Sequence, residues 1–82
     1  MRGSRMKMLN ESIRQWETDT RYYCAMVDTD LFGQVVLRRC WGGKKNRMGG
    51  MASDPYGTVD EAQQAMEVLA KVRKQHGYRL LN

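Results

Sequence analysis

The sequence predicts a small α+β domain in which an antiparallel sheet carries one helix. Two segments rich in β-branched and aromatic residues, 21–27 and 34–41, flank turn residues at 28–33 and are typical of a hairpin. A later segment has apolar residues at helical spacing and stops before Gly77. A chain of 82 residues has room for one core, so these elements belong to a single domain, expected over 12–82.

The strand expected at 34–41 sorts its side chains onto two faces, because successive residues of a strand point to opposite sides. One face carries Val35 and Leu37, followed by Arg39 and Trp41. Arg39 and Trp41 therefore leave the strand side by side, which suits contact with a phosphate and a ring together. Gly33 supplies the residue that most easily takes a positive φ in the preceding turn.

The helix is expected over about 58–76. Thr58 and Glu61 have the spacing of a capping box, in which each side chain bonds the other residue's backbone N–H. One apolar face follows, formed by Ala62, Ala65, Met66, Leu69 and Val72. Its alanines allow close packing on a sheet, and Gly77 ends the helix.

The remaining segments complete the expected fold. Residues 12–17 predict a short edge strand with Trp16 over the core. Residues 44–50 are expected to form a loop, and 51–56 a short, irregular strand interrupted by Pro55. Residues 78–81 are expected to return to the core. The polar residues 1–11 are expected to be disordered, and 1–4 have the composition of an expression leader.

Composition limits the class of protein. The net charge of +5 favours an anionic partner. Cys24, Cys40 and His76 lack the spacing of a metal site, and the cysteines are expected to be buried free thiols in a reducing compartment. The sequence has no run of eighteen apolar residues, which a membrane span would need, and no apolar segment near the N-terminus, which a signal peptide would need. The expected location is therefore cytoplasmic.

The stretch 38–50 concentrates the positive charge. It holds five cationic side chains within ten residues, with Trp41 among them and glycine pairs at 42–43 and 49–50. One interpretation is a nucleic-acid site, in which Lys and Arg neutralise phosphates and the ring stacks on a sugar or base. The other is a core tryptophan followed by a solvated basic hairpin. Residues 68–82 are basic without acids, and the two regions form one face if they meet in space.

The nucleic-acid interpretation names a set of candidate residues. They are Arg39, Trp41, Lys44, Lys45, Arg47, Lys74 and Arg79. With about four phosphates engaged, log K is expected to fall against log salt with a slope near −3.6.

Several short motifs follow one another along the chain. They are Arg21-Tyr22-Tyr23, Asp30-Leu31-Phe32-Gly33, Arg39-Cys40-Trp41-Gly42, Thr58-Val59-Asp60-Glu61-Ala62 and His76-Gly77-Tyr78-Arg79. In this order and spacing they resemble the WGR domain family, in particular its bacterial branch, over about residues 13–80. The resemblance implies a twisted antiparallel sheet of about four to five strands with one long helix packed across it. In poly(ADP-ribose) polymerases the similar domain binds DNA near strand breaks and contacts neighbouring domains, which implies DNA as the partner here.

One position departs from the family pattern. The family's signature arginine is replaced by Gly43, followed by Lys44 and Lys45. In the polymerases that arginine contacts DNA and other domains, so the departure puts a break-sensing role in doubt. A flexible lysine ammonium does not reproduce the planar fork of arginine.

A second functional hypothesis remains open beside the first. The same basic surface also suits an acidic partner protein, and the aromatic and Met residues suit an apolar one, which would make the chain an interaction or regulatory module. An enzyme is not expected, because no nucleophile–base pair and no glycine-rich phosphate loop is present in the sequence. No cofactor and no small-molecule substrate is expected either.

Overall fold

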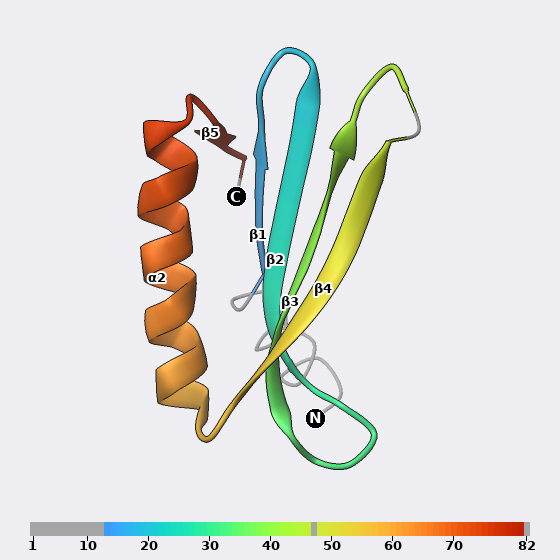
Figure 1. Cartoon of the computed structure of the whole chain (residues 1–82). Coiled ribbons are helices and arrows are strands. Elements are labelled where there is room, and N and C mark those ends of the chain that lie inside the picture. The colour runs from blue at the N-terminus through green and yellow to red at the C-terminus, as the bar shows by residue number, and fades with distance from the viewer. Residues whose placement is uncertain (1–12, 47, 82) are drawn as a thin grey trace, which may run out of the picture.

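The chain forms a five-stranded antiparallel sheet with one helix packed against one face, the α+β fold that the sequence predicts (Figure 1). A computed structural model describes residues 13–46 and 48–81. Its elements are β1 (Ile13–Glu17), β2 (Arg21–Thr29), β3 (Val35–Gly43), β4 (Gly49–Tyr56), α2 (Val59–Gln75) and β5 (Arg79–Leu80). The strand order is β4-β3-β2-β1-β5. The expectations for residues 1–11 and for Arg47 lie outside the described residues.

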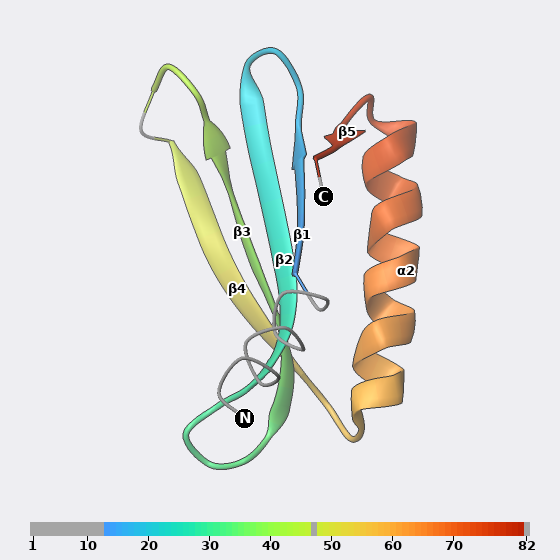
Figure 2. The same ribbon diagram turned by 180° about the vertical axis from the view of Figure 1, so that it is seen from behind.

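Helix α2 runs along one side of the sheet, and the two opposite views agree on which loops lie near its ends (Figures 1 and 2). The C-terminal end of α2 and β5 lie at the same end of the sheet as the β1–β2 and β3–β4 turns. The β2–β3 turn lies at the other end, toward the start of α2. The stretch rich in positive charge therefore shares one end of the molecule with the basic C-terminal residues.

The core lies between α2 and the odd-numbered residues of β2 and β3. Ala25 and Leu37 are buried there against Ala62 and Met66 of the helix, and Trp16 of β1 is only 3% exposed. Burying a side chain the size of Met66 stabilises the fold by about 1.5–3 kcal/mol. The predictions for Trp16 and for the apolar face of the helix are confirmed.

The ends of α2 match the sequence signals. The Glu61 N–H donates to Thr58 Oγ1 at 3.2 Å, and the Thr58 N–H donates to Glu61 Oε1 at 3.1 Å, so the capping box is formed. Gly77 follows the helix with φ +83°, and the Tyr78 N–H donates to the Arg73 carbonyl at 3.0 Å. This C-terminal motif turns the chain back toward the sheet.

Strand β4 is longer and more regular than expected. It begins at Gly49, inside the predicted loop, and passes through Pro55 without a break. The Gly43 N–H donates to Met48 O, and hydrogen-bonded residue pairs recur at every second position of the β3–β4 ladder from there. Pro55 and its partner Val36 therefore form a pair without hydrogen bonds between them. The missing N–H of Pro55 therefore faces away from β3, on the outermost strand, where it costs no ladder bond.

Three further expectations need correction. Strand β1 is not an edge strand over its whole length, because Trp16 and Glu17 pair with β5. Residues 78–81 return to the sheet through Tyr78 and β5, whereas Leu80 and Leu81 are more than half exposed. Both cysteines are half-exposed rather than buried, since they lie on the face of the sheet that α2 does not cover. Within residues 13–46 and 48–81, no helix combines the length and apolar character needed to cross a bilayer.

Candidate nucleic-acid interface

An open cleft of about 790 Å³ lies at the end of the sheet where β2 begins, β3 ends and α2 ends. Three aromatic and three guanidinium side chains line it: Tyr23, Trp41, Tyr78, Arg21, Arg39 and Arg73. Backbone from Gly42, Gly43 and Gly49 completes the wall. Two of the sequence-predicted residues, Arg39 and Trp41, therefore meet in one concave site.

The aromatic side of the cleft is organised around Tyr23. Trp41 stacks on Tyr23 with ring centroids 5.9 Å apart and planes at 16°, and Tyr78 meets Tyr23 edge-on at 6.2 Å. Tyr23 and Trp41 are direct cross-strand partners, so the register itself brings the rings together. Trp41 is half-buried, packs on the core and also lines the cleft.

The glycine pair at 49–50 makes room for the tryptophan. Gly50 is the cross-strand partner of Trp41 in β4, and a Cβ at Gly50 would lie 2.8 Å from Trp41 Cζ2. A side chain at position 50 would therefore push the ring out of its place over β4. This glycine is explained by packing, and it lies inside a strand rather than in a loop.

Arg39 is held on several sides at the floor of the cleft. Its Nη2 lies 3.0 Å from Asp54 Oδ2, its Nη1 donates to the Tyr23 hydroxyl at 3.5 Å, and its Cζ lies 5.7 Å from the centroid of the Trp41 ring. Its buried Nε–H has no acceptor within the described part of the chain.

Arg73 reaches the cleft from the last turn of α2. Its Cζ lies 4.5 Å from the centroid of the Tyr23 ring and 5.1 Å from that of Tyr78, distances typical of cation–π contacts. No carboxylate pairs with Arg73 among residues 13–46 and 48–81, and its buried Nε–H has no acceptor there. The guanidinium is thus held by rings while its charge stays uncompensated.

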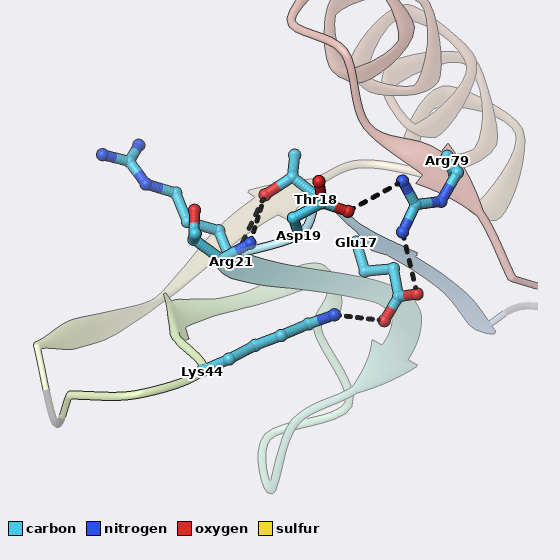
Figure 3. Close-up of polar contacts among 7 residues, drawn as sticks. Glu17, Thr18, Asp19, Arg21, Lys44 and Arg79 are labelled. Atoms are coloured by element: carbon cyan, nitrogen blue, oxygen red, sulfur yellow. Dashed lines mark hydrogen bonds and ion pairs between the residues drawn. The ribbon is translucent and has the colours of Figure 1, made fainter.

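Arg21 stands at the first position of β2 on the rim of the cleft. Figure 3 shows its guanidinium directed away from the neighbouring side chains, while its backbone N–H donates to Thr18 Oγ1 at 3.0 Å. The side chain is exposed and has no ion-pair partner in the described residues. Arg21 is also the cross-strand partner of Gly43.

The Glu17 carboxylate joins the basic loop to the basic C-terminal end (Figure 3). Lys44 Nζ lies 2.7 Å from Glu17 Oε1, and Arg79 Nη2 lies 3.2 Å from Glu17 Oε2. These hydrogen bonds, that to Lys44 first, lower the pKa of Glu17. Lys44 and Arg79 do come together, as one basic face would require, but a carboxylate already neutralises part of their charge.

The other predicted residues lie apart from the cleft. Lys45 is exposed in the turn between β3 and β4, and Lys74 is exposed on α2. Arg47 lies outside the described residues. Within residues 13–46 and 48–81, no three His, Cys, Asp or Glu side chains gather where a metal ion could bind.

Sequence reasoning missed Arg21, Arg73 and Tyr78 as cleft residues. Arg73 carried a usable signal: it lies seven residues after Met66 and four after Leu69, so it continues the apolar face of the helix toward the sheet. A cation at such a position indicates a charged group turned toward the core side. Arg21 carried no such signal, because its place depends on its pairing with β3.

Comparison of the chain with protein-family models, with curated proteins and with solved structures finds no match. The case for a function therefore depends on the geometry of the cleft and on the motifs of the sequence.

Proposed function

We propose that this chain is a non-catalytic module that binds nucleic acid, DNA in the first place, largely without regard to sequence. The observation that carries the proposal is the gathering of Arg21, Arg39 and Arg73 around one open cleft with aromatic walls. Guanidinium groups bind phosphate oxygens through paired N–H donors, and aromatic side chains give sugars and bases a surface to contact.

The cleft supports phosphate binding better than the basic loop does. Lys44 and Arg79 already share the Glu17 carboxylate, so a phosphate would have to displace an existing ion pair. Arg21 and Arg73 have no such partner among the described residues. Binding at the cleft gives these two charges a counter-ion without displacing a carboxylate, which favours the cleft as the site.

The resemblance to the WGR family is part of this proposal. The position of the family's signature arginine is Gly43, and Gly43 lines the cleft directly opposite Arg21 in the β2–β3 ladder. We infer that Arg21 supplies from the neighbouring strand the guanidinium that position 43 lacks. Arginine offers the planar fork that Lys44 and Lys45 cannot reproduce.

The test is a fluorescence-anisotropy titration of labelled single-stranded, blunt and nicked DNA at several salt concentrations. With Arg21 and Arg73 each engaging one phosphate, log K falls against log salt with a slope of about −1.8 for duplex and about −1.4 for single strands. Arg21→Gln weakens binding severalfold and makes the slope shallower by about 0.7–0.9. Lys71→Gln is the matched control, because it removes one exposed positive charge from α2 away from the cleft.

Two results would overturn the proposal. One is that none of the DNA forms shows salt-sensitive binding, even when the titration starts at low salt. The other is an equal loss of affinity in Arg21→Gln and Lys71→Gln, which would mean that net charge alone attracts DNA. Thermal melting of each variant confirms that the fold is intact, as expected for two exposed side chains without ion-pair partners in the described residues.

A separate observation favours a second candidate function, that of a protein-interaction module. Leu31 and Phe32, in the β2–β3 turn, are 99% and 93% exposed. The turn is nevertheless fixed: Asp30 Oδ1 accepts from the N–H groups of Phe32 and Gln34, each at 2.9 Å. The pair is thus presented at the end of the sheet opposite the cleft, where it suits an apolar pocket of a partner protein.

The two candidates are distinguished by nuclease-treated pull-down with wild type, Phe32→Ser and Arg21→Gln. A specific protein recovered by wild type and by Arg21→Gln but lost with Phe32→Ser supports the second candidate. Recovery that disappears with nuclease, or that is unaffected by Phe32→Ser, counts against it.

A further inference from the structure

The two cysteines of the chain lie directly opposite each other on neighbouring strands. Cys24 of β2 and Cys40 of β3 are paired in the antiparallel register. Both side chains lie on the face of the sheet away from α2, since the residues beside them, Tyr23 and Trp41, point toward the helix. Both are half-exposed, so reagents in solution can reach them.

The Cα spacing of this pair falls within the range of a disulfide. The Lys44 N–H donates to Thr20 O, and hydrogen-bonded pairs recur at every second residue along the ladder from there. Cys24 and Cys40 fall on that phase, where opposite Cα atoms of an antiparallel pair are about 5.5 Å apart. A disulfide needs Cα atoms about 4.4–6.8 Å apart, which this spacing meets, and Cβ atoms about 3.5–4.5 Å apart. The Cβ atoms of a hydrogen-bonded pair lie toward the wide end of about 4.5–5.5 Å, so the two strands must draw together slightly when the bond closes.

We propose that Cys24 and Cys40 are a redox-active dithiol that closes to an intramolecular disulfide on reaction with a small-molecule disulfide such as oxidised glutathione. One cysteine thiolate attacks a sulfur of the reagent, forms a mixed disulfide and releases one glutathione thiolate. The other cysteine then attacks the protein sulfur of that mixed disulfide and releases the second glutathione. The protein loses two protons and two electrons, and one glutathione disulfide becomes two glutathione thiols.

The surroundings of the pair slow this chemistry at neutral pH. Partial burial, followed by the neighbouring Cys40 thiol, raises the pKa of Cys24. Because the thiolate is the reactive form, exchange is expected to speed up as the pH rises. The bond would close a loop around the β2–β3 turn and lower the entropy of the unfolded chain, so the oxidised protein is expected to be the more stable form.

This inference goes beyond nucleic-acid binding and does not depend on it. The cysteines lie on the opposite face of the sheet from the cleft, although Cys40 is the residue between Arg39 and Trp41. A chain that binds no DNA can still form the disulfide. Thiol chemistry and binding are therefore measured separately.

The experiment treats the reduced full chain with oxidised glutathione and follows its intact mass, its free thiols and its melting. The expected product is a monomer that has lost two hydrogens, carries no glutathione and melts on the order of 10 °C higher. Dithiothreitol should reverse all three changes. Because the chain has two cysteines, a monomer with this mass can hold only the Cys24–Cys40 bond.

Cys24→Ser and Cys40→Ser serve as matched controls. Each retains one thiol, so it should stop at the mixed disulfide with one glutathione attached and show no such rise in melting temperature. Wild type that accumulates two glutathiones, links into dimers or keeps both thiols free would overturn the proposal. These outcomes are read from wild type alone, so the test stands even if a serine variant folds poorly.

Discussion

Replacing Arg73 with methionine tests how the cleft is built. Methionine keeps the length and helix propensity of the side chain but removes the charge that lies 4.5 Å from the Tyr23 ring and 5.1 Å from the Tyr78 ring. Two cation–π contacts at a half-buried site contribute about 1–3 kcal/mol together. Removing the Nε–H that lacks an acceptor recovers part of this, on the order of 1 kcal/mol. Taking about 2 kcal/mol from the middle of the first range, the expected net loss of stability is about 1 kcal/mol.

A loss of this size is measurable by thermal melting followed by circular dichroism. For a domain of this length it lowers the melting temperature by about 4–8 °C. Arg73→Lys should fall between methionine and wild type, because an ammonium keeps the charge but not the planar contact with two rings. Lys74→Gln is the control, since Lys74 is the next residue and is exposed.

An unchanged melting temperature for Arg73→Met would refute the account of Arg73 as a residue held by rings. A double-mutant cycle with Tyr78→Leu then measures the contact itself. Coupling near zero between the two substitutions would show that Arg73 and Tyr78 act independently.

Three further predictions concern stability. Lys44, and then Arg79, hold the folded-state pKa of Glu17 below its ordinary value of 4.5. The stability that Glu17 contributes is therefore complete above that ordinary value and is lost as the pH falls through the lowered pKa. Glu17→Gln should weaken the acid dependence of stability measured by urea denaturation across pH 2–6, and an unchanged acid dependence would contradict this. Gly50→Ala places a Cβ 2.8 Å from Trp41 Cζ2, so it should lower the free energy of unfolding by about 1–3 kcal/mol in denaturant titrations and shift the tryptophan fluorescence. Ser53→Ala, on the opposite face of β4, should have little effect. Equal effects of the two substitutions would refute the explanation of Gly50 by packing. Thr58→Ala removes the N-cap side chain of α2 and should lower the free energy of unfolding by about 1 kcal/mol in the same assay, whereas Thr58→Ser should stay close to wild type. No loss of stability in the alanine variant would mean that the capping box is not formed in solution.

Local patterns predicted much of the fold. The capping box at Thr58 and the glycine after His76 placed both ends of the helix, because the bonds that start and stop a helix form among residues three or four apart. Alternation along β3 placed Leu37, Arg39 and Trp41 on one face, which proved to be the face toward α2. Pro55 misled the prediction for β4, because the cost of a proline depends on whether its missing N–H faces a neighbouring strand.

Local sequence patterns predicted only part of the candidate site. Arg39 and Trp41 are two residues apart on one strand, so their proximity follows from the chain itself. Their companions Arg21 and Arg73 reach the cleft through the strand register and through the direction in which α2 faces the sheet. Neither relationship is encoded in a short window of sequence.

The sequence by itself determined the helix, the central hairpin, the two faces of β3 and the excess of positive charge. Only the tertiary structure decided which charges are available. Glu17 lies 27 residues from Lys44 and 62 from Arg79, yet its carboxylate contacts both, while Arg21 and Arg73 are left without a carboxylate among the described residues. The physical reason is that ion pairing and burial act through space at a few ångströms, whereas composition and periodicity are read along the chain. The register between β2 and β3 likewise placed Cys24 opposite Cys40.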